Sequence, residues 1–393
     1  MINDLAISSG YVSYNKYKEE LCGDRVEIIK PNDDLVVMVL ADGLGSGVKA
    51  NILSTLTSKT LATLLANNVP TSECVRTLAN ILPICKVRGV AYSTFTGIKI
   101  VGNEIAEIIE YDNPQVIVLR NGKEVDLERI SNKIDGKKIY MSTFRIQLGD
   151  ILIAMSDGAI HAGIGSCLNF GWERENIVKY IESKYIKSLS AKNVSSIIAN
   201  KCNELYENMP GDDTTISTIK VIKRTSVNLV IGPPEQKGDD RKMMNLFFSK
   251  SGHHIVCGGT TAGIVSRYLN KPVNTELNLK ELDKEIPPIS SIEGVDLVTE
   301  GVITINTVLK NCDDYLADNL RYSHWTQGND GASLLTRILI EEATDICFFV
   351  GKAVNPAHQN PDLKIGFNIK MKLVEAISKD LEKMGKKIVV SYF

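Results

Sequence analysis

Residues 36–51 read VVMVLADGLGSGVKAN. An apolar run typical of a buried strand ends in Asp42, and three glycines (Gly43, Gly45 and Gly47) follow before a segment with helical spacing. Two kinds of site have this outline. One is a phosphate-binding loop built from glycine amides, and the other is a metal site to which the aspartate contributes a ligand oxygen.

The bulk composition is that of an ordinary globular protein. The 393 residues carry a net charge of −2, and 44% of them are hydrophobic. This length favours two or three domains. The near-neutral charge gives no support for a nucleic-acid or anionic-membrane partner, and no apolar run approaches the roughly 20 residues that span a bilayer. We therefore expect neither a nucleic-acid nor a membrane partner.

The first residues and the cysteines favour a cytoplasmic protein. Residues 1–10 show no basic segment before an apolar stretch, so we expect no signal peptide. The eight cysteines are scattered without a CxxC pair, and most of them, such as Cys257, lie in apolar surroundings. Buried, reduced thiols are expected, and a zinc site is not.

The first part of the chain alternates short strand patterns with grouped helical patterns. Helices are expected over about 51–68, 71–85, 172–186 and 191–207. Hairpin turns are expected at Gly102-Asn103 and at Asn121-Gly122. Antiparallel strands with helices grouped between them predict a layered α+β domain.

The pattern changes near residue 224. From there on, strands and helices alternate, as is typical of βαβ units and a mostly parallel sheet. We therefore predict one domain over residues 1–224 and an α/β domain over residues 225–393.

Acidic residues beside glycines or threonines recur at the expected strand ends of the first domain. They are Asp24 in CGDR, Asp42 in ADGLGSG, Asp157 in SDGA, and Asp212 and Asp213 in GDDTT. Carboxylates of this kind suit hard cations such as Mg²⁺ or Mn²⁺, and no His or Cys accompanies them to favour zinc. The glycines of 43–47 match neither GxGxxG nor a loop ending in GK[ST], so the metal interpretation is favoured over a phosphate loop.

The order of these motifs resembles the metal-dependent protein phosphatases (PPM, the type 2C serine/threonine phosphatases), and within them the bacterial SpoIIE-like group. The stretches LCGDRVEI, LADGLGSGVKANILS, YDNPQVIVLRNGK and FRIQLGDILIAMSDG carry the resemblance, which covers about residues 5–222. It implies an α-β-β-α sandwich of two antiparallel sheets flanked by helices. One stretch departs from the group, because Asp112-Asn113-Pro114 stands where a Gly-His-Pro-like turn is usual.

The resemblance also implies a site and a reaction. Two divalent cations, Mn²⁺ or Mg²⁺, would be held by Asp24, Asp42, the Gly43 carbonyl, Asp157 and Asp212. Asp213 would orient ligands or water, or replace Asp212 as the ligand. A metal-activated water would hydrolyse phosphoserine or phosphothreonine. The implied partner is a phosphorylated protein in bacterial partner-switching signalling, such as an anti-sigma antagonist.

Other interpretations stay open at this point. The aspartates could simply cap turns, and the chain could be a catalytically weak scaffold or act on a small phosphorylated molecule. His161 as a general acid and Arg25 as a phosphate ligand each compete with a purely structural or solvated role. Trp172 is expected in the core or at a partner contact.

In the second domain, Gly258, Gly259, Thr260 and Thr261 lie between a strand and a helix pattern. Their amides and hydroxyls could bind a small anionic ligand at a helix N-terminus, although a tight turn capped by a threonine is the simpler alternative. Asp239 and Asp240 are expected in an exposed loop. This domain would regulate the first or select its substrate.

Overall fold

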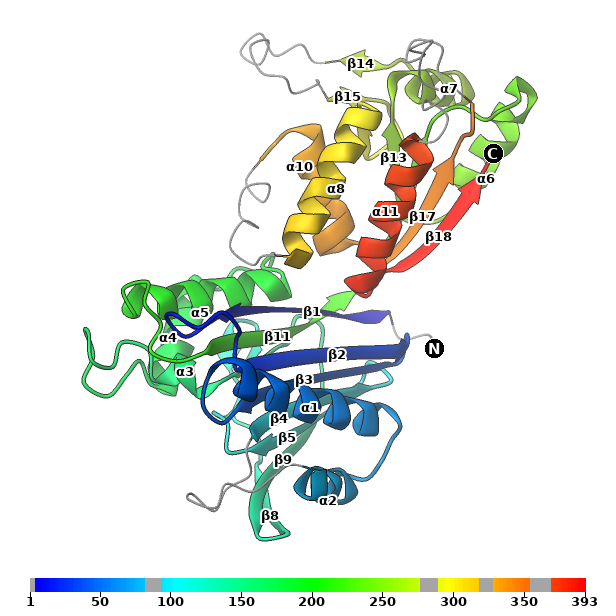
Figure 1. Ribbon diagram of the computed structural model, residues 1–393. Coiled ribbons are helices and arrows are strands. Elements are labelled where there is room, and N and C mark those ends of the chain that lie inside the picture. The colour runs from blue at the N-terminus through cyan, green and yellow to red at the C-terminus, as the bar shows by residue number, and fades with distance from the viewer. Residues whose placement is uncertain (1–3, 82–92, 276–288, 318–327, 354–368) are drawn as a thin grey trace. The chain divides into compact units, whose positions relative to one another are not determined.

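The computed structural model describes residues 4–81, 93–275, 289–317, 328–353 and 369–393 (Figure 1). The chain divides into two compact units, Met1–Lys223 and Arg224–Phe393. Within the described ranges, no helix has both the length and the apolar character that crossing a bilayer requires.

The first unit contains two antiparallel sheets. Sheet I has the strand order β1-β11-β10-β6-β7, and sheet II has the order β2-β3-β4-β5-β9-β8. The strands of sheet I are β1 (Leu5–Tyr14), β11 (Thr214–Lys223), β10 (Ile151–Met155), β6 (Ile117–Arg120) and β7 (Lys123–Glu124). Those of sheet II are β2 (Asp24–Asn32), β3 (Leu35–Gly43), β4 (Ser93–Val101), β5 (Ile105–Tyr111), β9 (Lys137–Arg145) and β8 (Ile130–Ile134).

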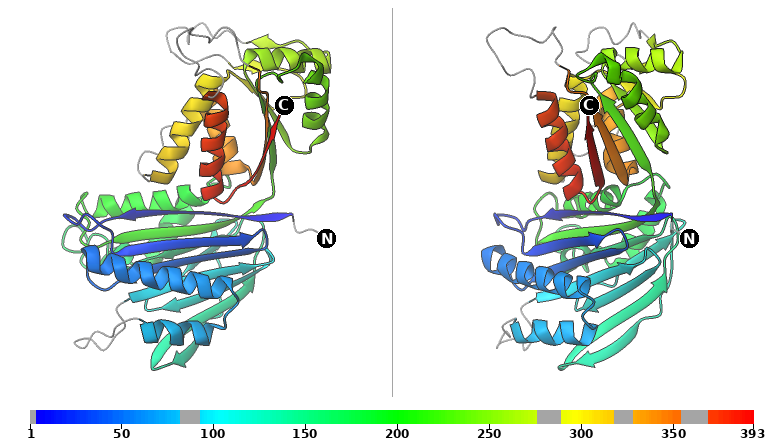
Figure 2. Two further views of the ribbon diagram at one scale, coloured as in Figure 1. Left: turned by 45° about the vertical axis from the view of Figure 1, so that its right-hand side comes forward. Right: turned by 90° about the vertical axis from the view of Figure 1, so that its right-hand side faces the viewer.

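Helices cover the outer face of each sheet. Sheet II is covered by α1 (Gly47–Ala66) and α2 (Thr71–Ile81). Sheet I is covered by α3 (Asp157–Ile160), α4 (Arg174–Lys184) and α5 (Ala191–Leu205). The layers can be followed in the views of Figure 2. The predicted α-β-β-α sandwich is therefore confirmed.

Strand β3 contributes side chains to two hydrophobic cores, one on each of its faces. Its even-numbered residues Val36, Met38 and Leu40 lie between the two sheets. The odd-numbered residues of the same strand pack under α1. A strand buried on both faces needs a continuous apolar run rather than an alternating one, which is what residues 35–41 supply.

The predicted helices and hairpins of this unit are present with shifted ends. Helix α1 begins at Gly47, four residues before the predicted start, and α2 is described only as far as Ile81, so residues 82–85 of that prediction lie outside the described residues. The turn at Gly102-Asn103 joins β4 to β5, and the turn at Asn121-Gly122 joins β6 to β7. All four turn residues have positive φ, as these hairpin turns require.

The second unit is an α/β layer around sheet III, whose order is β14-β15-β16-β13-β12-β17-β18. The pairs β12–β13, β12–β17, β13–β16 and β17–β18 are parallel, so the prediction of a mostly parallel sheet is confirmed. Its strands are β12 (Ser226–Ile231), β13 (His253–Cys257), β14 (Asn274–Thr275), β15 (Ser290–Ser291), β16 (Leu297–Thr299), β17 (Asp345–Val350) and β18 (Lys387–Tyr392).

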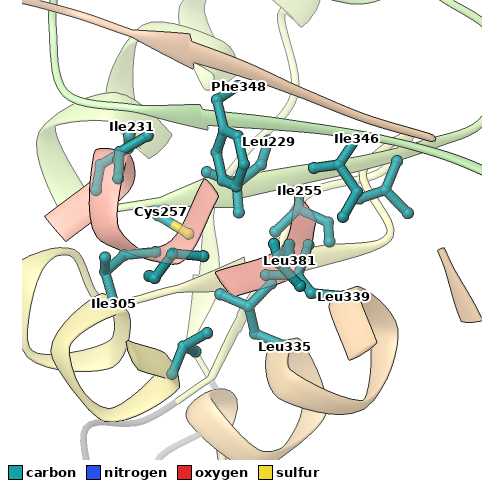
Figure 3. Packing of buried hydrophobic residues seen from close by; sticks show 14 of the residues in the cluster. Leu229, Ile231, Ile255, Cys257, Ile305, Leu335, Leu339, Ile346, Phe348 and Leu381 are labelled. Atoms are coloured by element: carbon teal, nitrogen blue, oxygen red, sulfur yellow. The ribbon is translucent and has the colours of Figure 1, made fainter. Parts of the chain in front are cut away.

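Helices pack on both faces of sheet III. One face carries α6 (Asp240–Ser249), which follows the short 3-10 helix η1 (Lys237–Asp239), and α7 (Gly259–Leu269). The other carries α8 (Val302–Ala317), α10 (Gly331–Arg337), the π-helical turn η2 (Ile338–Glu342) and α11 (Ile369–Lys383). Figure 3 shows this second core, in which Leu229, Ile255 and Phe348 of the sheet meet Leu335 and Leu381 of the helices.

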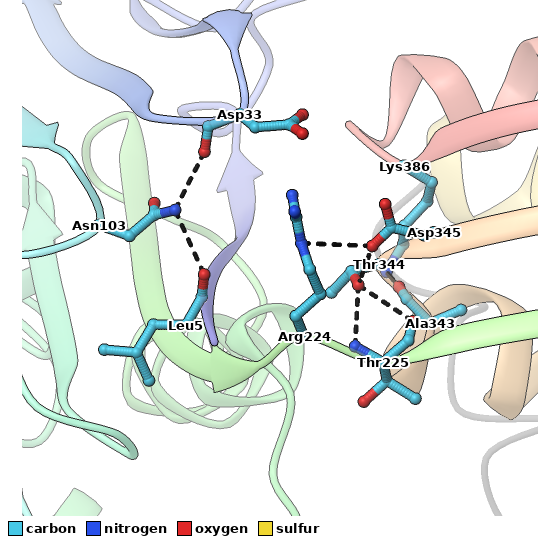
Figure 4. A network of polar contacts seen from close by, with 9 residues as sticks. All are labelled: Leu5, Asp33, Asn103, Arg224, Thr225, Ala343, Thr344, Asp345 and Lys386. Carbon is cyan, nitrogen blue, oxygen red and sulfur yellow. Dashed lines mark hydrogen bonds and ion pairs between the residues drawn. The ribbon is translucent and has the colours of Figure 1, made fainter. Parts of the chain in front are cut away.

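Each unit has a polar contact that fixes loops to strands (Figure 4). In the first unit, the Asn103 amide donates to the carbonyls of Leu5 and Asp33 at 3.2 and 3.0 Å. In the second, the Thr225 amide donates to the Thr344 hydroxyl at 2.9 Å, and Arg224 lies 3.4 Å from the Asp345 carboxylate. The second contact anchors the start of β12 beside the start of β17.

Candidate metal centre

Asp24 and Asp42 lie directly opposite each other on neighbouring strands. Asp24 begins β2, Asp42 is the second-last residue of β3, and the two form a cross-strand pair in the antiparallel register of sheet II. The Cβ atoms of such a pair are about 5 Å apart on the same face of the sheet. Asp42 shares this face with Leu40, which packs between the sheets, so both carboxylates lie at the rim of the inter-sheet core.

Asp157 and Asp213 come from the matching end of sheet I. Strand β10 ends at Met155, and β11 begins at Thr214. The Ser156 amide donates to the Thr215 carbonyl at 3.0 Å, and the Thr215 amide donates to the Ser156 hydroxyl at 2.9 Å. These two bonds hold the SDG segment beside the GDDTT segment.

Two glycines allow the acidic segments to come together. A Cβ at Gly158 would lie 2.2 Å from the Asp213 carbonyl oxygen, and a Cβ at Gly23 would lie 2.7 Å from Oδ2 of Asp213. Real Cβ atoms do not approach other atoms so closely. The end of sheet II that carries Asp24 therefore touches the end of sheet I that carries Asp213.

The glycines after Asp42 allow the chain to turn from β3 into α1. A Cβ at Gly43 would lie 2.1 Å from the Ala50 carbonyl oxygen, so only glycine fits beneath the first turns of the helix. Gly45 and Gly47 have φ of +104° and +66°, which side chains disfavour. All three glycines of this loop thus have a steric or conformational role, and the ligand role of the Gly43 carbonyl stays a prediction.

Buried carboxylate oxygens at this centre lack partners. Asp24 is 4% exposed, and among the described residues neither of its oxygens accepts a well-formed hydrogen bond. Asp213 is also 4% exposed; its Oδ1 accepts from the Lys16 amide at 3.0 Å, and its Oδ2 has no described partner. An ionised carboxylate buried in this way is costly unless a cation offsets its charge.

The aspartates shift one another's proton affinities. Burial raises the pKa of Asp42 far above its ordinary value, and the negative charges of Asp24, Asp157 and Asp212 raise it further. Burial likewise raises the pKa of Asp24, an effect that the hydroxyls of Ser156 and Thr215 partly offset. Burial and the charge of Asp157 raise the pKa of Asp212. Such clustering of perturbed carboxyls is typical of functional sites.

The donor set fits hard divalent cations by its chemistry. It offers carboxylate oxygens, some buried and unpartnered, from four segments that lie far apart in sequence. Within the described part of the chain, however, no three His, Cys, Asp or Glu side chains are already gathered closely enough to hold a metal ion. The ligand roles of Asp24, Asp42, Asp157, Asp212 and Asp213 therefore remain predictions.

The other residues considered from the sequence lie in ordinary structural settings. His161 is exposed, and its amide donates to the Asp157 carbonyl at the end of α3. Arg25 is exposed on β2. Trp172 is 7% exposed and packs edge-to-face on Tyr180 at 5.3 Å, so it lies in the core, which was one of the two settings expected for it.

Sequence reasoning assigned no role to Asn113, which the structure places beside the centre. Asn113 is buried; its Oδ1 accepts from the Thr94 hydroxyl at 2.6 Å, and its Nδ2 donates to the Thr96 hydroxyl at 3.2 Å. Thr94 is the cross-strand neighbour of Asp42, and the Ser93 hydroxyl donates to the Asp42 carbonyl at 2.9 Å. The only sequence signal was the unusual turn Asp112-Asn113-Pro114.

In the second unit, Gly258 to Thr261 join β13 to α7. Gly258 has φ of +103° and precedes the first helical residue, Gly259. The Thr261 hydroxyl accepts from the Gly232 amide at 2.9 Å, so it fixes the end of β12. Asp239 and Asp240 were expected in an exposed loop, and the structure corrects this. Asp239 belongs to η1, and Asp240 begins α6, where its carboxylate lies 3.8 Å from Arg267.

Comparison with known proteins agrees with this architecture. The sequence profile of the family described as "Stage II sporulation protein E (SpoIIE)" matches residues 32–222. Over this segment the chain is similar to the SpoIIE family. The match begins after Asp24 and includes Asp42, Asp157, Asp212 and Asp213. No match was found among curated proteins.

Solved structures of SpoIIE-like and related phosphatase domains are similar over a little more than half of the chain. The PP2C phosphatase domain with a regulatory-domain fragment of SpoIIE from Bacillus subtilis has a TM-score of 0.49 at 17% identity, over 57% of this chain and 64% of that one. The RsbU and RsbW domains of Rv1364c from Mycobacterium tuberculosis give 0.44 at 16%, over 56% and 61%. The catalytic domain of the serine/threonine phosphatase PstP with two manganese ions gives 0.37 at 17%, over 56% and 100%. The chain thus spans less than two thirds of the first two.

Proposed function

We propose that this chain is a metal-dependent protein serine/threonine phosphatase whose catalytic domain is residues 1–224. The observation that supports the proposal is that Asp42 lies within electrostatic range of Asp24, Asp157 and Asp212 at one end of the sandwich, where carboxylate oxygens of Asp24 and Asp213 are buried without partners among the described residues. Similarity to the SpoIIE family supports the same reaction class.

The residues that would hold two divalent cations, Mn²⁺ or Mg²⁺, are Asp24, Asp42, Asp157 and Asp212, with the Gly43 carbonyl. Bound cations of this kind supply a nucleophilic water at neutral pH and neutralise phosphoryl charge. The part of the protein itself is positioning. Two rigid sheets present the carboxylates, and Asp213, fixed by the Lys16 amide, would orient ligands or water.

The substrate we propose is a phosphorylated protein in bacterial, cytoplasmic partner-switching signalling, such as an anti-sigma antagonist. Similarity to the SpoIIE family is the support for this step. A panel of phosphoserine and phosphothreonine peptides, compared with small phosphoesters, distinguishes a protein phosphatase from an enzyme that acts on small molecules.

The test is hydrolysis of these substrates by the full chain with Mn²⁺ and with EDTA. We expect turnover only with the metal, and Asp42→Asn should lower it at least about a thousandfold, because one ligand carboxylate is lost. Asp34→Asn, at an exposed position of the β2–β3 turn, is the matched control and should keep full activity. Unchanged turnover in Asp42→Asn overturns the proposal. Absence of turnover in the native chain favours a scaffold.

For residues 225–393, we propose a regulatory or substrate-selecting domain with a small anionic ligand at Gly258, Gly259, Thr260 and Thr261. Helix α7 begins at Gly259, so its first amides are free of partners within the helix. The ammonium group of Lys370 lies close to this turn. A Cβ added at Gly232 would lie 2.2 Å from the Lys370 Nζ, and the Gly232 amide donates to the Thr261 hydroxyl. A cationic group at this place supports an anion as the ligand. The change in melting temperature on addition of inorganic phosphate or nucleotides tests the site. We expect the melting temperature to rise in the native chain and not in Lys370→Ala.

A further inference from the structure

Strand β18 is an edge strand of sheet III among the described residues. It pairs with β17 along its whole length, and no described residue pairs with its other side. The Lys387 amide donates to Thr344 and the Phe393 amide to Val350, both at 2.9 Å. Because backbone groups alternate between the two edges of a strand, the even-numbered residues Ile388, Val390 and Tyr392 direct their amides and carbonyls outward. Such a row of unpaired groups is a template for another strand.

The middle of this edge lacks the features that usually protect one. Natural edge strands are blunted by a central lysine, a proline or a bulge. The central residues of β18 are Val389 and Val390, its register with β17 is continuous, and its lysine stands at the first position. Val389 is 50% exposed. A regular edge of six residues, apolar at its centre, is thus unpaired within the described part of the chain.

Helix α11 overlies β18 and carries a self-complementary charge pattern. Lys372, Glu375, Lys379 and Glu382 are exposed on it, and none of them forms an ion pair with another described residue. If a second copy of the helix ran antiparallel about Ile377, Lys372 would face Glu382 of that copy, and Glu375 would face Lys379 of that copy. Every one of the four charges would then meet its opposite.

The charged helix face and the open strand edge lie together. Burial raises the pKa of the Tyr392 hydroxyl at the end of β18, and the charge of the Glu375 carboxylate and its hydrogen bond with this hydroxyl raise it further. The carboxylate of Asp380, in contrast, lies beside Asp313 of α8. The side of α11 that carries Glu375 therefore overhangs the edge, and the side that carries Asp380 faces the other helices. Figure 1 shows α11 running alongside β18.

The helix pattern and the strand edge also share one centre. Ile377 is six residues before the helix end at Lys383, which is about 9 Å at the rise of an α-helix. Val390 is three residues after the strand start at Lys387, which is about 10 Å along a strand. Since the two ends are joined by a short turn, both centres lie at the same level and fit a single two-fold axis.

We propose that β18 and α11 form the interface of a symmetric homodimer of this chain. The two β18 strands pair antiparallel about Val390, so that Ile388 bonds to Tyr392 of the second copy, and the two sheets become continuous. A second copy is the occupant because the charge pattern is complementary to itself, and an unrelated partner would have no need of that symmetry.

Sedimentation velocity of the full chain over a concentration series tests the interface. We expect a reversible dimer. Glu375→Lys and Lys379→Glu should each weaken dimerisation at least about tenfold, because two like-charge contacts replace two attractive ones. The double variant Glu375→Lys/Lys379→Glu should restore it, and a mixture of the two single variants should form the heterodimer.

Two further variants separate the interface from general effects. Lys310→Glu makes the same charge change at an exposed position of α8 and should leave the dimer intact. Val389→Lys, at the exposed centre of the edge, should make the chain monomeric while leaving it folded. A monomeric native chain, single reversals that remain dimeric, or failure of the double variant to dimerise would overturn the proposal. The readout needs no phosphatase activity, so it stands apart from the proposed reaction.

Discussion

Gly158 lies directly against the carbonyl oxygen of Asp213, where a Cβ would come within 2.2 Å of that oxygen and 2.7 Å of the Thr214 hydroxyl. This contact joins the SDG segment after β10 to the GDDTT segment before β11. It explains in steric terms why an aspartate in the first segment is followed by glycine: any side chain at residue 158 would push the two acidic segments apart.

Gly158→Ala should therefore separate the candidate ligands. We expect loss of most Mn²⁺-dependent turnover and a fall of about 1–3 kcal/mol in the free energy of unfolding, because backbone must move to admit the methyl group. Gly238→Ala is the control, since a Cβ there meets nothing within 4 Å. Urea unfolding and the phosphatase assay measure both effects. Full activity in Gly158→Ala would show that the contact does not position the site.

Asp24→Asn should have opposite effects on stability and function. The Asp24 carboxylate is buried among negative charges without a well-formed hydrogen bond, so its replacement by a neutral amide should stabilise the protein in EDTA by on the order of 2 kcal/mol. Turnover should be lost, and so should the rise in melting temperature that Mn²⁺ gives the native chain. Urea unfolding with EDTA and with Mn²⁺ checks this. Destabilisation in EDTA would mean that Asp24 is satisfied in the protein itself.

The sequence predicts the sandwich well because its strands are strongly patterned. Residues 35–41 are apolar throughout and lie in a strand buried on both faces, and turns at Gly102-Asn103 and Asn121-Gly122 fix two hairpins. The predicted start of α1, at about residue 51, lies four residues after the observed start at Gly47. Gly45 and Gly47 look like loop residues from their sequence, and only the packing of Ala50 over Gly43 shows that the helix already begins there.

The candidate aspartates could be picked out from their order along the chain, and the family resemblance implied that they converge, but the contacts that bring them near one another could not be predicted. Their proximity depends on the register that places Asp24 opposite Asp42, and on the contact between Gly23 and Asp213, both of which are tertiary. The contacts of Asn113 could not be predicted from the sequence for the same reason. Threonines at 94 and 96 read as ordinary strand residues until β4 is placed beside Asn113.

Lys30 should make the stability of the first unit depend on pH. Its Nζ donates to the Ile7 carbonyl at 3.0 Å, and burial lowers its pKa to about 8. Below pH 8 the ammonium is charged in both the folded and unfolded states, so the folded state carries the full cost of burying it. Between pH 8 and the unfolded value of about 10.4, the folded state loses its proton first, and that cost is relieved as pH rises.

Lys30→Met removes this dependence. The variant should be more stable than the native chain at pH 7, by up to about 3 kcal/mol, and the advantage should shrink as pH approaches 10. Urea unfolding of both proteins across this range gives the difference directly. A difference that stays constant with pH would mean that the Lys30 ammonium is adequately solvated in the folded protein.

Asn113→Ala should impair catalysis through the position of Asp42. The substitution removes the acceptor of the Thr94 hydroxyl and the donor to Thr96, leaving buried hydroxyls unpaired beside the strand that carries Asp42. We expect kcat to fall about tenfold with KM little changed, and stability to fall by about 1–2 kcal/mol. Asn132→Ala on the exposed strand β8 is the matched control. Asn113→Asp keeps the acceptor for Thr94 and should recover part of the activity; if both Asn113 variants retain native kcat, these contacts serve stability alone.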